Sequence, residues 1–450
     1  MDPLSCISPV DGRYHKITAP LSAFFSEEAL IRYRILSEIE YFIALCQLPL
    51  PALSGPDGPG HEKMRDLYRK FTRSDARQIK AIEQTTRHDI KAVEYFIKEA
   101  FEKIGYGKYK EYVHFGLTSQ DINNTAIPLS LKEAMSGVMQ PAFEQLMDAL
   151  RTLANDWLEI PMLARTHGQP ASPTTVGKEI MVFHNRLSIQ LRQLSSLPYP
   201  AKFGGATGNF NAHRVTFPDI DWSGFANRFV ASLGLERSQV TTQIDHYDQL
   251  AAIFDCLRRI ATILIDLVRD CWTYISLDYF KQKIVAGEVG SSAMPHKVNP
   301  IDFENAEGNA GLAIALLGHL SEKLPISRLQ RDLSDSTVLR NIGLPLAHLL
   351  IALKATSRGL GKLSLNREKI DSDLEGNMVV VAEAIQSILR SLDYPEPYEA
   401  LKKLTRQRKA VTKEELQRFI DGLTIAPGQK ERLKQITPFN YTGIIPPRID

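Results

Sequence analysis

The amino-acid sequence predicts an all-α protein with three helical domains and a central bundle of long helices. Apolar residues recur at alternating steps of four and three over 139–157, 176–187 and 253–274. This spacing places them on one face of a helix, and stripes of this length are typical of long helices that pack nearly parallel. Because such a seam can continue into another subunit, we expect an oligomer.

Length and charge limit the kind of protein this can be. With 450 residues, the chain is too long for one ordinary core. We expect an N-terminal helical domain at 1–114, a long-helix bundle at 115–360 with a loop at 282–300, and a small helical domain at 361–450. The net charge of +2 does not indicate a nucleic-acid or membrane surface, so an anionic ligand would need local clusters of Arg and Lys.

The sequence also predicts a compartment. Its first residues lack the basic start and apolar core of a signal peptide, and no run of 18 apolar residues occurs, so we expect no transmembrane helix. The four cysteines are scattered and never spaced as C-x-x-C, which favours reduced thiols and a cytoplasmic protein. The histidines show no metal-ligand spacing, and the glycines of 202–213 form no nucleotide-binding motif. We therefore expect no metal and no cofactor.

Local signals predict where individual helices begin and end. Ser26, followed by two glutamates, is expected to cap a helix that runs to about Cys46. The four prolines and three glycines of 47–60 indicate a linker. A capping box at Thr412–Glu415 predicts a helix that Gly422 ends.

Three polar clusters in the first part of the chain have both a structural and a chemical interpretation. Arg13 and Tyr14 follow an Asp-Gly turn, as surface residues or as ligand contacts. Thr85–Asp89 falls inside a helical pattern, where it would form a solvated face. Thr118 or Ser119 is placed to cap the next helix, and a helix N-terminus can also hold an anion.

Two further clusters lie among the long helices. His167 stands next to a glycine and shortly before a proline, where an imidazole can transfer protons or simply hydrogen-bond within a turn. Arg328, Arg331 and Arg340 lie among Ser and Thr hydroxyls. Guanidinium groups donate paired hydrogen bonds, so this segment would be either an anion cradle or an ion-paired surface.

The stretch Gly290–Pro300 is a loop between two strongly helical segments. Pro295 and Pro300 exclude a continuous helix, and the glycine and serines at its start give the backbone freedom. A polar helix connector would have this composition, but so would a loop that carries chemistry, since it holds hydroxyls, one Lys and one Asn.

Taken together, these clusters resemble one family over nearly the whole chain. Resemblance to the fumarase/aspartase superfamily is carried by Gly290–Pro300, Thr118–Asp121 and Arg165–Gln169. Resemblance to the adenylosuccinate lyases of bacterial type is carried by Ser8–Tyr14, Thr85–Asp89, Thr241–Ile244, Arg331 and Ser336–Arg340. It implies β-elimination of fumarate from adenylosuccinate, giving AMP, and from the succinyl-carboxamide ribotide of purine synthesis. It also implies a homotetramer whose multi-helix core is shared and whose sites draw on several subunits.

The same resemblance implies roles for single residues. His167 would be the general acid and Ser291 the general base. Nucleotide contacts are implied for Arg13, Tyr14, Arg87, His88, Asp89, Arg331, Ser336, Thr337 and Arg340. Further substrate contacts are implied for Thr118, Ser119, Gln243, Ser292, Lys297, Val298, Asn299 and Asn305.

Two positions depart from the family pattern, and two other interpretations stay open. Arg87 stands where relatives often have a smaller polar residue, and His246-Tyr247-Asp248 replaces an expected Pro-His-Asp. Both changes bear on affinity, and neither removes the expected acid or base. One competing interpretation is a sister lyase with another fumarate-yielding substrate. The other is a non-catalytic helical oligomer, in which replacing Ser291 would have no effect.

Overall fold

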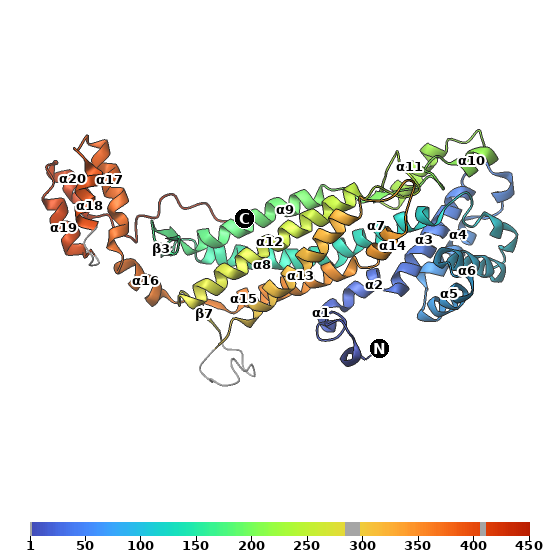
Figure 1. Ribbon diagram of the computed structural model, residues 1–450, viewed down its shortest axis with the longest axis horizontal. Helices are drawn as coiled ribbons and strands as arrows, with labels where there is room; N and C mark the ends of the chain where they lie inside the picture. The colour runs from blue at the N-terminus through green and yellow to red at the C-terminus, as the bar shows by residue number, and fades with distance from the viewer. Residues whose placement is uncertain (1, 284–297, 406–410) are drawn as a thin grey trace. The chain divides into compact units, whose positions relative to one another are not determined.

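The computed structural model describes residues 2–283, 298–405 and 411–450 and confirms the all-α prediction (Figure 1). Its α-helices are α1 (His15–Thr18), α2 (Ser22–Phe25), α3 (Glu27–Cys46), α4 (Gly58–Arg69), α5 (Arg73–Thr86), α6 (Asp89–Lys103), α7 (Ser119–Ala134), α8 (Gln140–Asp156), α9 (Val176–Ser195), α10 (Asn211–Thr216), α11 (Trp222–Ser232), α12 (Asp248–Ser276), α13 (Ile301–Lys323), α14 (Ser334–Leu339), α15 (Gly343–Gly361), α16 (Arg367–Glu375), α17 (Ala382–Ser391), α18 (Pro397–Thr405), α19 (Lys413–Asp421) and α20 (Pro427–Lys434).

Strands within the described residues are only two or three residues long. They form the antiparallel pairs β1 (Pro161–Met162) with β4 (Thr174–Thr175), β2 (Arg165–Thr166) with β3 (Gln169–Pro170), and β7 (Phe280–Gln282) with β8 (Leu363–Leu365), and the parallel pair β5 (Pro200–Ala201) with β6 (Glu236–Arg237). Such short ladders join helices and do not form a sheet layer.

The chain packs into two compact units. Unit 1 comprises Met1–Phe143, Gln190–Thr262 and Gly308–Leu353, and unit 2 comprises Glu144–Ile189, Ile263–Glu307 and Lys354–Asp450. The long helices α8, α9, α12, α13 and α15 contribute residues to both. The domain boundaries expected after residues 114 and 360 stay a prediction.

The apolar stripes of the long helices lie in the core, as predicted. Leu146 and Leu150 of α8 and Leu264 and Leu267 of α12 are at most 1% exposed. Polar residues join the outer faces of neighbouring helices, as in the ion pair of Arg186 on α9 with Asp266 on α12 within unit 2. Burial of these stripes therefore drives the packing, since exposed ion pairs contribute little.

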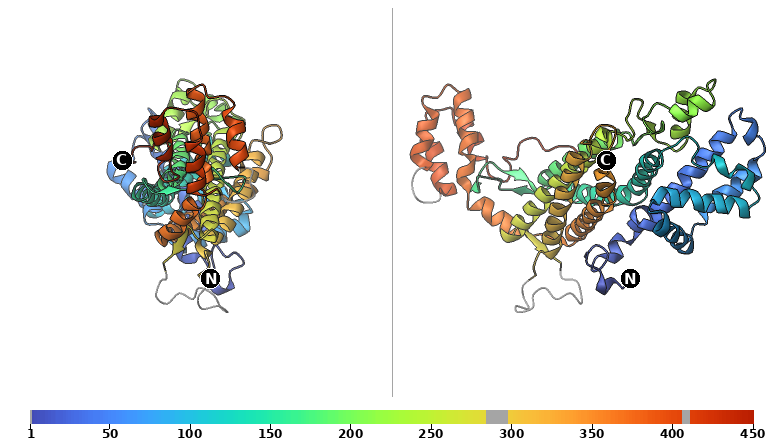
Figure 2. Two further views of the ribbon diagram at one scale, coloured as in Figure 1. Left: turned by 90° about the vertical axis from the view of Figure 1, so that its left-hand side faces the viewer. Right: turned by 45° about the vertical axis from the view of Figure 1, so that its right-hand side comes forward.

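Helix α3 is the central element of the core of unit 1. The Ser26 hydroxyl accepts a hydrogen bond from the Ala29 amide at 3.1 Å, which confirms the predicted cap. Beyond that cap α3 is buried on most of its surface, so it is not a one-sided amphipathic helix. It packs mainly against α4 and α7, and the views of Figure 2 show α3 to α6 grouped together.

The C-terminal helices α17 to α20 have an apolar core of their own within unit 2 (Figure 2). The predicted capping box is present, because the Thr412 amide donates to Glu415 at 2.9 Å and the Glu415 amide donates back to the Thr412 hydroxyl at 3.2 Å. Gly422 ends α19, as expected.

One stretch among the described residues, Ser334–Gly361, is long and apolar enough by length and composition to cross a membrane, with a mean hydropathy of 1.4. In the structure, 56% of the 18-residue window that gives this hydropathy is buried. Burial of this extent is what a core helix shows, and α15 supplies the core residues Leu346, Leu349 and Leu353.

His213 lies in the aromatic core of unit 1 without solvent exposure. Its Nε2 is 2.9 Å from the Tyr41 hydroxyl, and the Trp222 ring centroid is 4.7 Å away. Its Nδ1 has no hydrogen-bond partner among the described residues. Burial lowers the pKa of His213 to about 4, because the apolar surroundings penalise the imidazolium.

This lowered pKa predicts an acid-sensitive core. The unfolded His213 binds a proton near pH 6.5, whereas the folded one stays neutral until about pH 4. Stability from neutral His213 is therefore complete above pH 6.5 and lost as the pH falls toward 4, by about 3 kcal/mol in total. Urea unfolding at several pH values should show this loss in wild type and a shallower pH dependence in His213→Gln. Parallel curves for the two proteins would contradict the prediction.

Candidate functional site

The cluster Thr85–Asp89 is a break between two helices, and the prediction that it lies inside one helix is wrong. Arg87 ends α5 in the left-handed backbone region, with a φ of 56°. His88 is the N-cap of α6, where its Nδ1 accepts from the Lys91 amide at 3.1 Å. The sequence did not signal this break, because Arg, unlike Gly or Asn, seldom adopts a positive φ.

Asp89 lies in a network of charges that joins residues of several helices. Its Oδ2 accepts from Arg34 Nη2 at 2.7 Å and from Arg340 Nη2 at 3.0 Å. Burial alone would raise the pKa of the Asp89 carboxyl, but the two guanidinium groups outweigh it and hold that pKa below its ordinary value. Asp89 therefore carries a full negative charge near neutral pH.

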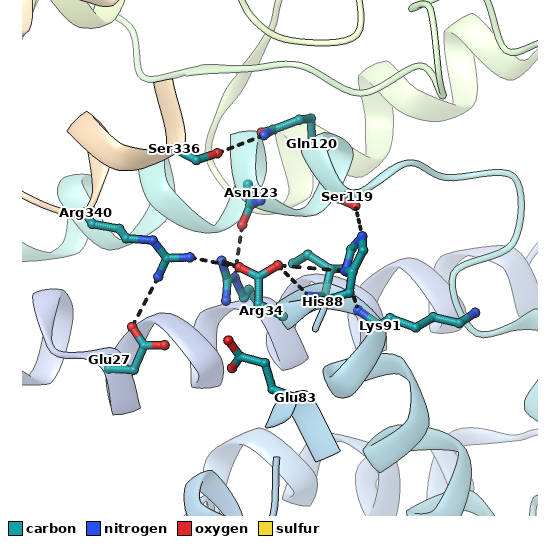
Figure 3. A network of polar contacts seen from close by, with 12 residues as sticks. Glu27, Arg34, Glu83, His88, Lys91, Ser119, Gln120, Asn123, Ser336 and Arg340 are labelled. Atoms are coloured by element: carbon teal, nitrogen blue, oxygen red, sulfur yellow. Dashed lines mark hydrogen bonds and ion pairs between the residues drawn. The ribbon is translucent and has the colours of Figure 1, made fainter. Parts of the chain in front are cut away.

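The same network connects the N-terminus of α7 with the end of α14 (Figure 3). Arg34 Nε donates to Asn123 Oδ1 on α7 at 3.0 Å, and Ser119 Oγ lies 3.4 Å from His88 Nε2. Arg340, which follows α14, also donates to Glu27 at 3.3 Å. Four predicted site residues, His88, Asp89, Ser119 and Arg340, thus lie within one group of contacts.

A buried carboxylate holds the first turn of α7. Asp121 Oδ2 accepts from the Thr118 amide at 2.8 Å, and its Oδ1 lies 2.7 Å from Lys202 Nζ. The Oδ1 atom also accepts from the amides of Gly204 and Gly205, at 2.8 and 3.1 Å. Burial lowers the pKa of the Lys202 ammonium, and Asp121 offsets part of that shift. Thr118 is thereby confirmed as the N-cap of α7.

The predicted anion cradle has Arg331 at its centre. Arg331 Nη1 donates to Gln243 Oε1 at 3.4 Å, and Nη2 donates to Ser336 Oγ at 3.2 Å. Its buried Nε has no hydrogen-bond partner among the described residues. Arg328 instead points to Asp332 on a side chain that is 80% exposed. The candidate cradle therefore consists of Gln243, Arg331 and Ser336, and Arg328 lies at the surface.

The remaining predicted residues of unit 1 are exposed or half-buried. Arg13 is exposed and Tyr14 is half-buried, both in the turn before α1. Arg87 is exposed between α5 and α6, and Thr337 is exposed on α14. All four are in unit 1.

The other predicted site residues belong to unit 2. His167 is exposed at the tip of the β2–β3 hairpin, with a φ of 52°. This hairpin is anchored by Arg165, whose Nη2 lies 3.3 Å from Asp373 Oδ2 on α16. Val298 is exposed, Asn299 is half-buried, and Asn305 is half-buried on α13. Ser291, Ser292 and Lys297 lie outside the described residues.

Three charged residues that contact the predicted site or its motifs were not predicted. Arg34 binds Asp89, Lys202 binds Asp121, and Asp373 binds Arg165. For Lys202 a signal was present, because it stands between Ala201 and Phe203, whereas Arg34 lies on a helix that carries several other charged residues. A lone charge in such a setting is buried only if it is paired.

The Arg34–Asp89 pair predicts a large difference between two Arg→Met variants. Arg34 is only 3% exposed, so Arg34→Met leaves Asp89 with a single cation and should lower the free energy of unfolding by about 3–5 kcal/mol. Arg73 is 76% exposed and pairs with Glu28, so the control Arg73→Met should cost at most about 1 kcal/mol. Urea unfolding at one protein concentration measures both. Equal losses would show that burial of Arg34 adds nothing.

Comparisons with known proteins agree with this fold and show the family. A family model described as Lyase matches residues 12–314, and one described as Adenylosuccinate lyase C-terminal matches residues 327–442. The chain is 58% identical to an adenylosuccinate lyase of Dictyostelium discoideum and 46% identical to one of Escherichia coli strain K12, each over 98% of this chain and 97% of the relative. A solved fumarate lyase of Mesorhizobium sp. BNC1 has the same fold, with a TM-score of 0.73 at 18% identity over 94% of this chain and 95% of that one. The chain belongs to the adenylosuccinate lyase family.

Proposed function

We propose that this lyase cleaves adenylosuccinate to AMP and fumarate, and the related succinyl-aminoimidazole carboxamide ribotide to its carboxamide ribotide (AICAR) and fumarate. The observation that carries the proposal is the 58% identity to an adenylosuccinate lyase over nearly the full chain. Both reactions belong to purine nucleotide synthesis and share one chemical step, the β-elimination of a nitrogen from a succinyl group.

The elimination requires a base, an acid and stabilisation of a carbanion. A base removes the proton from the carbon next to a carboxylate, the C–N bond breaks, and an acid protonates the departing nitrogen. His167 is our candidate acid, because the hairpin turn leaves its imidazole exposed and within reach of a ligand. Ser291 is our candidate base, and Ser292, Lys297, Val298 and Asn299 would hold the succinyl carboxylates, where a cation and amides stabilise the developing charge.

The nucleotide end of the substrate would lie at the donor clusters of unit 1. Arg331 and Ser336 offer donors to a phosphate, and Arg340, Thr337, Arg13, Tyr14 and Arg87 would extend that set. His88, Asp89, Thr118 and Ser119, near the first turn of α7, and Gln243, beside Arg331, would contact the rest of the nucleotide. Asn305 would contact substrate from α13. Local donors of this kind suit a phosphate in a chain with a net charge of only +2.

Assembly and location complete the proposal. The candidate acid belongs to unit 2 and the phosphate donors to unit 1. A homotetramer in which several subunits contribute to each site fits the long apolar helices. We propose a cytoplasmic enzyme that acts on small nucleotides, without a metal, cofactor, nucleic acid or membrane partner.

The direct test supplies purified protein with adenylosuccinate and no added metal or cofactor. Wild type should release AMP and fumarate in equal amounts, and His167→Ala and Ser291→Ala should each lower kcat by about 10²-fold or more, because each removes a proton-transfer group. Absorbance and chromatography follow both products. If wild type forms no fumarate, or if Ser291→Ala matches wild type, the proposal fails.

A phosphate requirement separates this function from that of a sister lyase. Succinyladenosine, which lacks only the phosphate, should be cleaved with a kcat/KM lower by about 10²-fold or more, because at least two charge-assisted hydrogen bonds are lost. Arg331→Met should reduce the difference in kcat/KM between the two substrates. Equal cleavage of both substrates by wild type would contradict a phosphate site at Arg331.

A further inference from the structure

Tyr247 is held in the core of unit 1 against the preference of its backbone. Its φ is 64°, in the left-handed region that bulky side chains seldom adopt, and only 3% of its surface is exposed. The Asp245 carboxylate accepts from the Tyr247 amide at 2.9 Å and so supports the turn. A strained residue persists only where its surroundings determine its position, and strain of this kind concentrates at functional sites.

The phenol of Tyr247 both donates and accepts a hydrogen bond. It donates to Asp335 Oδ2 at 2.8 Å and accepts from Asn124 Nδ2 at 3.0 Å. Burial, together with the nearby Asp335 carboxylate, raises the pKa of Tyr247 well above its ordinary value. The hydroxyl therefore keeps its proton and remains a donor to Asp335 throughout the neutral pH range.

These contacts close into a ring of five residues, which we name the Tyr247 ring: Tyr247, Asn124, Gln120, Ser336 and Asp335. From Asn124, the second amide hydrogen goes to Gln120 Oε1 at 3.0 Å, and Gln120 Nε2 donates to Ser336 Oγ at 3.4 Å (Figure 3). The Ser336 amide donates to Asp335 Oδ1 at 2.7 Å, which closes the ring. All members except Ser336 are at most 3% exposed, so the ring forms a satisfied buried network.

The ring meets the anion cradle at Ser336. The Ser336 hydroxyl also accepts a hydrogen bond from Arg331 Nη2 at 3.2 Å, and Arg331 Nη1 donates to Gln243 Oε1 at 3.4 Å. The ring thus joins three segments that are distant in sequence, namely the start of α7, the turn before α12 and the segment around α14. Each of these segments carries predicted substrate contacts.

We propose that Tyr247 is a positioning residue for the phosphate end of the nucleotide, acting through Asp335 on Ser336 and Arg331. This inference rests on the proposed function, because it takes the cradle to bind that phosphate. Tyr247 itself touches no substrate. The Tyr247 hydroxyl holds the Asp335 carboxylate, and that carboxylate fixes the backbone of Ser336. The Ser336 hydroxyl is thereby positioned to contact both Arg331 and the phosphate.

The test is Tyr247→Phe, which removes one oxygen atom and leaves the packing in place. The KM for adenylosuccinate and the calorimetric Kd of AMP should both rise about tenfold, the effect of losing one hydrogen bond to a charged group. The kcat should change by less than about threefold, because the reacting bond lies at the succinyl end. Inhibition by fumarate, which occupies only that end, should be unchanged.

Tyr33→Phe is the matched control. Tyr33 is fully buried in unit 1 and donates to the carboxylate of Glu133, outside the Tyr247 ring. Loss of the Tyr33 hydroxyl should lower the midpoint temperature of unfolding without changing the Kd of AMP. Combining Tyr247→Phe with Asp335→Asn should weaken AMP binding by less than the product of the two single effects, because both changes act on one contact.

The outcomes separate the two proposals. Fumarate release by wild type with an unchanged AMP Kd in Tyr247→Phe would overturn the positioning role and leave the lyase function standing. Equal weakening of AMP and fumarate binding would also overturn it, since a general loosening of the fold would do the same. If wild type binds AMP but releases no fumarate, the proposed reaction fails, and the AMP measurement still decides the role of Tyr247.

Discussion

Asp121 and Lys202 form an ion pair in which neither side chain is exposed, and much of unit 1 depends on it. Removing two charges from water costs several kcal/mol, and the cost is offset only when both groups are fully hydrogen-bonded. Here Asp121 accepts from Lys202, Gly204, Gly205 and the Thr118 amide, and Lys202 also donates to the Gly205 carbonyl oxygen. Loss of either partner would leave a buried charge unpaired, so the start of α7 and the 202–205 crossing are fixed together.

This pair also explains the glycines that superficially resemble a nucleotide-binding loop. The amides of Gly204 and Gly205 bind an anion, but the anion is the chain's own Asp121 carboxylate. A Cβ at Gly204 would lie 2.8 Å from the Gly208 carbonyl oxygen, and Gly205 has a φ of 79°, so both positions require glycine. These glycine amides therefore bind a carboxylate of the protein itself and stabilise the fold.

Charge in the candidate site is local and already paired. Arg340 contacts Glu27 and Asp89, and Arg34 contacts Asp89. Each of these arginine charges is therefore balanced by a neighbouring carboxylate. An anion that reaches Arg340 must share it with those carboxylates, which limits affinity and favours a ligand with several contacts. Arg331 differs, because its Nε lies 4.0 Å from Asp335 Oδ1 and makes no hydrogen bond within the described residues.

Local rules made part of this structure predictable. The caps at Ser26, Thr118 and Thr412 depend on a few neighbouring residues, and the apolar stripes of α8, α9 and α12 depend on helical spacing alone. The motifs for His167 and Arg331 were found through their resemblance to a family, which carries information that spacing lacks. The break at Arg87 was missed, because its left-handed conformation has no local sequence signal.

The sequence by itself determined the helical class, the main helix boundaries, the family and the residue types available for catalysis, since these follow from periodicity, capping and motifs. Only the tertiary structure decided which of those residues meet. Tyr247 looked like a departure in a motif, yet its hydroxyl joins Asn124 to Asp335 across more than a hundred residues of chain. Arg34 looks like an ordinary surface charge until its carboxylate partner, Asp89, is seen. Buried polar groups must find partners in space, and the chain order does not reveal which partners folding will bring to them.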